Sequence, residues 1–135
     1  LGETKLYPSD PTVALIVDSA LDTINDTISH ALLPSLFERD QEKKLQMRAE
    51  FATGPMALSF AYIENLLGLS EGPFVGGNEL SIADLVIANN ILTVRKGTLD
   101  GVTEEHLAPY PLINALTDAY LADPRVIAYN EFANG

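Results

Sequence analysis

The sequence predicts an all-α protein: a helical bundle with two long helices and several shorter ones. Apolar residues recur at steps of three and four over long stretches, and no stretch alternates convincingly with a period of two. Proline and glycine punctuate these stretches where helices are expected to begin or end. With 135 residues, of which 47% are hydrophobic and 20% charged, the chain can bury the core of one domain.

The first predicted helix runs from Pro11 to near Pro34. Ser9 or Asp10 can cap it, and Pro11 suits the first helical position because the N–H that proline lacks has no intrahelical partner there. A proline disrupts the helical hydrogen bonds that precede it, so the helix should end or bend near Pro34. Its apolar stripe consists of Val13, Ile16, Val17, Ala20, Ile24, Thr27, Ile28, Ala31 and Leu32.

The second predicted helix runs from about Gln41 to Leu67. The pair Gly54-Pro55 lies inside it, so we expect a bend there rather than a straight rod. Gly68 is placed to end the helix, and residues 70–77 form a turn rich in glycine and proline. The apolar stripe of this helix consists of Leu45, Ala49, Ala52, Met56, Phe60, Ile63 and Leu67.

Shorter helices fill the rest of the chain. One begins in the segment 80–85 and runs to about Arg95, and a short helical turn is expected at 103–107. Two more follow, over 111–121 and 124–132, each opening on a proline.

The sharpest local motif is the helix start at Leu80-Ser81-Ile82-Ala83-Asp84-Leu85. The Ser81 side chain can accept the N–H of Asp84, while the Asp84 carboxylate reaches back to the N–H of Ser81, which is a capping box. Leu80 and Leu85 are placed as the hydrophobic staple across it. No histidine lies near in sequence to act as a base, so the motif indicates helix capping and not a catalytic Ser–Asp pair.

Composition argues against several classes of function. The net charge of -11 repels the phosphates of nucleic acids and of acidic membranes, so neither is an expected partner. No apolar run reaches the roughly 18–20 residues of a membrane span. The absence of cysteine excludes disulfides and thiolate chemistry within this segment, and two histidines make a metal centre unexpected.

An acidic stripe follows the first helix. Asp18, Asp22 and Asp26 are spaced i, i+4, i+8 and therefore share one helix face, where like charges repel. The stripe is either a solvated face or a surface that meets a cationic partner. Such a partner could be the ammonium group of a ligand, a basic side chain of a second subunit, or a divalent ion.

Several motifs, taken together and in this order, resemble the C-terminal helical domain of the cytosolic glutathione transferases, especially their sigma and pi classes. The longest resembles the "FVG…(S/T)xAD" box of that domain, and the acidic stripe resembles its "VDxxxDxxxD" pattern. The sequence departs from the family in a longer loop from Thr98 to Glu105. The segments that carry the resemblance are 1–8, 15–26, 73–84, 110–112 and 123–126.

The resemblance implies a division of the chain. Residues 1–8 correspond to the end of an N-terminal domain and the linker, and residues 9–135 to the helical domain. The thioredoxin-like N-terminal domain, which holds most of the glutathione site and the catalytic Tyr or Ser, is absent from this segment. No catalytic residue is therefore expected here, and Tyr7 belongs to the linker.

The resemblance also implies a function. The full-length protein would be a cytoplasmic homodimer that conjugates the glutathione thiolate to small hydrophobic electrophiles. Asp26, and to a lesser degree Asp22, would bind the γ-glutamyl ammonium of glutathione held in the partner subunit. Leu32, Leu33 and Leu36 would form the wall of the electrophile pocket, beside the protein's own N-terminal domain.

Two alternatives stay open at the level of sequence. The same helical domain serves as a non-catalytic interaction module in elongation-factor subunits, aminoacyl-tRNA synthetases and lens crystallins. Such a module would keep the capping box but would need neither Asp26 nor an open apolar cleft. The other alternative is an unrelated helical bundle.

Overall fold

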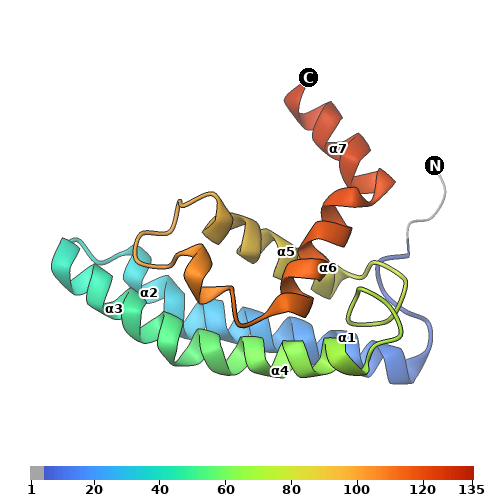
Figure 1. Cartoon of the computed structure of the whole chain (residues 1–135), viewed down its shortest axis with the longest axis horizontal. Helices are drawn as coiled ribbons and strands as arrows, with labels where there is room; N and C mark the ends of the chain where they lie inside the picture. The colour runs from blue at the N-terminus through green and yellow to red at the C-terminus, as the bar shows by residue number, and fades with distance from the viewer. Residues whose placement is uncertain (1–4) are drawn as a thin grey trace.

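Residues 5–135 of the computed structural model fold into helices joined by short loops (Figure 1). Within that range the extended pairing is limited to one isolated bridge, between Phe74 and Gly77. The all-α prediction is confirmed, while residues 1–4 of the predicted linker lie outside the described residues. The elements are α1 (Pro11–Asp26), the π-helical turn η1 (Thr27–Leu32), α2 (Leu33–Leu36), α3 (Gln41–Thr53), α4 (Pro55–Leu69), α5 (Ile82–Arg95), the 3-10 turn η2 (Glu104–His106), α6 (Pro111–Ala122) and α7 (Pro124–Asn134).

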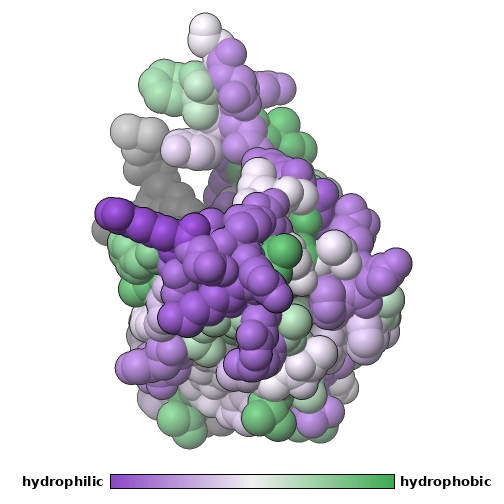
Figure 2. All heavy atoms as spheres, turned by 90° about the vertical axis from the view of Figure 1, so that its left-hand side faces the viewer, coloured by the Kyte–Doolittle hydropathy of each residue, from purple (hydrophilic) through white to green (hydrophobic). Residues whose placement is uncertain are grey.

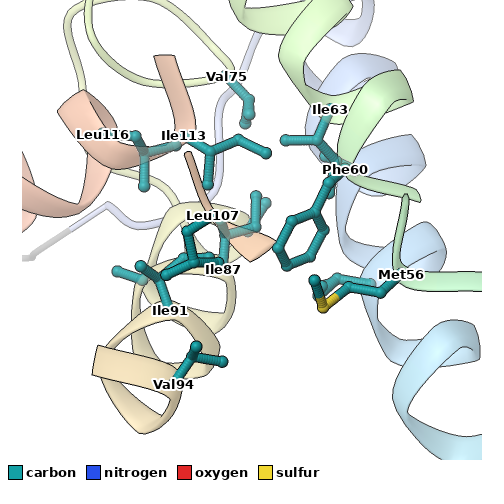
Figure 3. Packing of buried hydrophobic residues seen from close by; sticks show 14 of the residues in the cluster. Met56, Phe60, Ile63, Val75, Ile87, Ile91, Val94, Leu107, Ile113 and Leu116 are labelled. Atoms are coloured by element: carbon teal, nitrogen blue, oxygen red, sulfur yellow. The ribbon is translucent and has the colours of Figure 1, made fainter. Parts of the chain in front are cut away.

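The helices pack around one apolar core. Helices α1, α3 and α4 run along the long axis of the molecule, and α7 projects from it at the end of α6 (Figure 1). Helix α1 packs against α4 and α5, while α6 packs against α4, α5 and α7. In Figure 3, Phe60 and Ile63 of α4 point toward Leu107 and toward Ile113 of α6. The Phe60 ring also meets the Tyr110 ring edge to face, with 5.4 Å between centroids.

The first long helix continues past Pro34 by widening its last turns. The sequence predicted an end or bend near this proline, and the structure places the π turn η1 directly before it. There the N–H of Leu33 bonds to the carbonyl of Ile28, five residues back instead of four. Proline has no N–H, and its ring would meet the carbonyl four residues back in a regular α-helix. The π turn therefore lets the chain pass Pro34 and end the helix at Leu36.

The second long helix is bent where the sequence predicted. Gly54 separates α3 from α4 with φ -112° and ψ -95°, and Pro55 opens α4. A Cβ at Gly54 would stand 3.0 Å from the carbonyl oxygen of Glu50, so a side chain at the bend would be crowded against the backbone of α3. The predicted stop at Gly68 is wrong, because α4 continues two residues beyond Leu67 to Leu69, and Ser70 follows it in extended conformation.

The end of the molecule formed by α2 and α3 has a largely hydrophilic surface. Figure 2 looks onto this end, and hydrophobic residues appear there as separate patches among hydrophilic ones. Across residues 5–135, no helix has both the length and the apolar character needed to cross a bilayer.

Helix α7 depends on the cap at Asp123. The Asp123 carboxylate accepts the backbone N–H of Arg125 at 2.9 Å and also pairs with the Arg125 guanidinium, at 2.9 Å to Nε and 2.8 Å to Nη2. This guanidinium holds the pKa of Asp123 below its usual value. Only Val126 of α7 is buried, so little apolar packing supplements the cap.

Because its pKa is lower in the folded state, Asp123 stabilises α7 above its unfolded pKa of about 4, and this contribution is lost as the pH falls through the lowered value. We expect amide hydrogen exchange in α7 to accelerate relative to α5 below about pH 4. Asp123→Asn, which can still cap but cannot titrate, should remove that extra acid dependence. An identical pH profile in the two proteins would show that Asp123 does not control the docking of α7.

Candidate functional site

The Ser81–Asp84 motif forms a capping box at the start of α5. Oδ2 of Asp84 accepts the backbone N–H of Ser81 at 2.7 Å. It also accepts the Ser81 hydroxyl at 2.7 Å, a bond that the capping-box pattern does not require. Asp84 is fully buried and Ser81 nearly so. Since no histidine is among its hydrogen-bond partners, the pair serves as a helix cap.

Asp84 also holds a loop that the capping pattern alone does not predict. Its Oδ1 accepts the N–H of Val75 at 3.0 Å, which ties residues 73–77 to the start of α5. The same loop lies close against α1, because a Cβ at Gly76 would stand 3.1 Å from Cγ1 of Val13. One carboxylate therefore positions α5 and, through the loop, its contact with α1.

Burial raises the pKa of Asp84, because removing a carboxylate from water disfavours its charged form. The hydrogen bonds from Val75 and Ser81 oppose that effect by stabilising the charge. The carboxylate is thus costly to bury, and three donors offset the cost. The Asp84 carboxylate therefore has a structural role and does not face an open cavity.

The structure divides the acidic stripe of α1 into two parts. Oδ2 of Asp18 accepts the Tyr7 hydroxyl at 2.7 Å, and this bond raises the pKa of Tyr7. Asp18 therefore anchors the linker segment to α1. The carboxylates of Asp22 and Asp26 are exposed and form neither a hydrogen bond nor an ion pair with any residue from 5 to 135. They are the two members of the stripe that can meet a partner.

The three leucines expected to line an electrophile pocket do not share one environment. Leu32, the last residue of the π turn, is buried in the domain core at 8% exposure. Leu33 and Leu36 are exposed at 40% and 49%. The helix thus presents Leu33 and Leu36 to the outside, whereas Leu32 contributes to the stability of the domain.

Two hollows of similar size flank the linker, and sequence reasoning did not predict them. The first, of about 440 Å³, lies between the linker and the start of α1. The second, of about 450 Å³, lies between α5, α6 and α7. Leu6 and Leu80 line both, and the carbonyl of Leu6 accepts the N–H of Ile82 at 2.8 Å. Leu6 belongs to no periodic apolar pattern, so the sequence alone could not predict the contact between the linker and the start of α5.

No group of three or more His, Asp or Glu side chains is arranged to hold a metal ion within the part of the chain that the structure describes. Two other features are candidates for binding: the exposed carboxylates of Asp22 and Asp26 on α1, and the hollows beside the linker.

Comparison with known proteins identifies the fold. The family model of the glutathione S-transferase C-terminal domain matches residues 25–132, most of the chain. The chain belongs to this family. A search of curated proteins gives no significant match.

Two solved structures resemble the glutathione S-transferase domain described above. Prostaglandin synthase D of Nilaparvata lugens matches with a TM-score of 0.73 and 20% identity, over 93% of this chain. A glutathione transferase homologue from Sulfitobacter, solved with bound glutathione, matches with a TM-score of 0.66 and 26% identity, over 95% of this chain. The chain spans 60% and 59% of these two proteins, respectively. The predicted resemblance to glutathione transferases is confirmed.

We expect Asp84→Ala to lower the free energy of unfolding by about 3 kcal/mol or more, since it leaves buried donors of Val75 and Ser81 without an acceptor. Ser81→Ala, which keeps the bonds to both backbone N–H groups, should cost less. Asp22→Ala, at an exposed position, should stay within about 0.5 kcal/mol of the parent protein. Urea titration measures all three, and equal stability of Asp84→Ala and Asp22→Ala would refute the anchoring role of Asp84.

Proposed function

We propose that this chain is the helical domain of a glutathione transferase that joins the glutathione thiolate to small hydrophobic electrophiles. The main support is the match of the glutathione S-transferase C-terminal domain over residues 25–132. The Sulfitobacter homologue, which matches nearly the whole chain, was solved with glutathione bound. That ligand supports the choice of glutathione as co-substrate.

In this proposal, Asp26 binds the γ-glutamyl ammonium of glutathione held by the partner subunit, with Asp22 in a secondary role. Both carboxylates are exposed and have no partner among residues 5–135. An ammonium group offers such a carboxylate a charge-assisted hydrogen bond. Asp18 is a poor candidate because the Tyr7 hydroxyl already occupies it.

A homodimer would bring this acidic stripe to a second copy. Helix α4 exposes Leu58, Tyr62 and Leu69 at helical spacing along one stripe. The Tyr62 hydroxyl contacts Ser19 of α1, which shares a helix face with Asp22 and Asp26. The apolar stripe of α4 thus lies beside the acidic stripe of α1. Burying exposed apolar side chains against a second copy would supply the driving force for association.

The reaction takes place largely outside this chain. The thiolate attacks an electrophilic carbon, and a C–S bond forms. In a substitution, a leaving group departs with the electron pair of the bond that breaks. In an addition, the double bond of the electrophile opens, and its electron pair moves away from the carbon that was attacked. We place the side chain that lowers the thiol pKa in a preceding thioredoxin-like domain. That domain would contact the helical one at the linker, where two hollows flank Leu6. Leu33 and Leu36 would contribute an apolar wall to the electrophile pocket. We place the protein in the cytoplasm.

In the full-length dimer, Asp26→Asn should raise the KM for glutathione several-fold and leave the fold intact, because the amide keeps the shape of the carboxylate but lacks its charge. Asp22→Asn should have a smaller effect. Asp18→Asn is the matched control on the same stripe and should leave the KM unchanged. Steady-state kinetics with varied glutathione measures all three, and an unaltered KM in Asp26→Asn removes Asp26 from the site.

Retention on immobilised glutathione separates the transferase from a non-catalytic interaction module. The full-length protein should be retained and should elute with free glutathione. Failure of the folded protein to bind would favour the module, whose assembly role needs no glutathione.

The proposed dimer predicts the effect of a charge in the α4 stripe. Leu58→Glu should convert the dimer to a monomer in sedimentation analysis while preserving the helical circular dichroism spectrum, because a buried unpaired carboxylate opposes association. Leu121→Glu on α6, at another exposed leucine, is the control and should remain dimeric. A dimeric Leu58→Glu protein would place the interface elsewhere.

A further inference from the structure

Two further hollows meet at the loop between α5 and η2. The inner one, about 30 Å³, lies between the π turn, helices α3 and α4, and the end of α5. The outer one, about 380 Å³, is formed by the loop itself and opens to solvent. Val94 and Leu99 line both hollows, and each is nearly buried. These two side chains therefore form the partition between an outer hollow and an inner one.

The inner hollow is apolar in character. Its polar lining residues are all engaged: Thr27 bonds to the carbonyl of Thr23 and to the Ser59 hydroxyl of α4. Asn90 bonds to the carbonyl of Val86, and Thr93 to that of Asn89. An apolar cavity of this kind gives water few partners and tends to stay dry. Its volume is that of about two water-sized spheres, and displacing Leu99 would add the space of a leucine side chain. The remaining lining includes Ile24, Ile28, Leu32, Phe51, Met56 and Phe60.

A buried arginine holds the loop over the inner hollow. Arg48 of α3 is 5% exposed, and no carboxylate among residues 5–135 pairs with it. Its Nη1 donates to the carbonyl of Asp100 at 3.0 Å, and its Nε donates to the Ser35 hydroxyl at 3.1 Å. Ser35 in turn donates to the carbonyl of Leu32 at 2.7 Å. The guanidinium thus connects both walls of the hollow, at the π turn and at the loop.

Apart from the bond to Arg48, the loop is held by two hydrogen bonds to the end of α5 and by the burial of Leu99 and Val102. The Gly97 N–H donates to the carbonyl of Val94, and the Thr98 hydroxyl donates to the carbonyl of Thr93, both at 3.0 Å.

Gly97 and Gly101, with φ of 67° and 85°, bracket the segment that carries Leu99. Glycine reaches this conformation without the cost that other residues incur. A Cβ at Gly97 would meet nothing within 4 Å, so the loop has room to move there, whereas Gly101 lies close against Arg48 and Leu45 of α3. The bond from Arg48 is made to a neutral carbonyl and not to a carboxylate, which makes it weaker than an ion pair between the same groups would be.

The entrance carries negative charge. Asp100 and Glu104 line the outer hollow and form no ion pair with any described residue. Arg95, the cation of this hollow, is engaged by Asp118 at 2.8 Å and by the Asn114 side chain at 3.0 Å. A molecule entering here therefore meets two free carboxylates and one neutralised guanidinium.

We propose that the two hollows form one gated site for small apolar molecules, in which Leu99 is the gate and Arg48 holds it closed. The apolar part of the ligand displaces Leu99 and occupies the inner hollow. The carboxylates at the entrance favour a ligand with a cationic end over one with an anionic end. The site does not depend on glutathione chemistry.

Methyl NMR on the full chain tests this site with three four-carbon probes: n-butylammonium, 1-butanol and butanesulfonate. The methyl groups of Ile24 and Leu99 should shift saturably, whereas those of the exposed Leu121 should not. Affinity should fall in the order ammonium, alcohol, sulfonate. Shifts that do not saturate, or sulfonate binding as tight as ammonium binding, would overturn the proposal.

Variants separate the gate from the chamber. Leu99→Ala should tighten binding several-fold, because no side chain then has to be displaced, and Leu121→Ala should leave it unchanged. Val94→Phe should fill the hollow and abolish binding while urea titration reports an intact fold. If that variant does not fold, Ile28→Phe fills the hollow from the opposite wall. Unchanged affinity in Leu99→Ala, or in a folded filled variant, would show that the probes bind elsewhere.

Discussion

The arrangement of this domain depends on the buried carboxylate of Asp84. It accepts two bonds from Ser81 at the start of α5 and one from Val75 in the preceding loop. That loop lies on α1 at Gly76, where even a methyl group would be crowded. A buried charge is tolerated only where donors surround it, so this group also demands one particular packing of helix and loop. Removing the Asp84 carboxylate would loosen the contact between α1, which carries the acidic stripe, and α5, which lines the inner hollow.

Helix α1 packs into the core with one face and carries the acidic stripe, which we propose for recognition, on the other. Its inner face contributes Val17, Ala20 and Ile24 to the core. Its outer face carries the acidic stripe, of which Asp22 and Asp26 are exposed. Like charges on one helix face repel and destabilise the helix. The apolar packing of the inner face must offset this repulsion. A helix that retains such a stripe is well suited to meet a positively charged group.

The π turn has consequences at both candidate sites. It carries the helix past Pro34, leaves Leu33 and Leu36 on the outside, and turns Leu32 into the core. It also brings Ser35 to Arg48, whose guanidinium reaches the loop after α5. A π turn adds a residue to the helical repeat, which changes the direction of every side chain that follows it. The π turn therefore determines both the exposure of Leu33 and Leu36 and the lining of the inner hollow.

The sequence by itself determined the helical class, the bend at Gly54, and the cap at Ser81 and Asp84. These features depend on period, proline and residues close in the chain, so local physics decides them. The tertiary structure alone decided the hydrogen bonds from Val75 to Asp84, from Tyr7 to Asp18 and from Arg48 to Asp100. Each joins residues that no helical or strand period relates. A distance in sequence does not specify a distance in space until the core has packed, and only the packed core shows which acids are free.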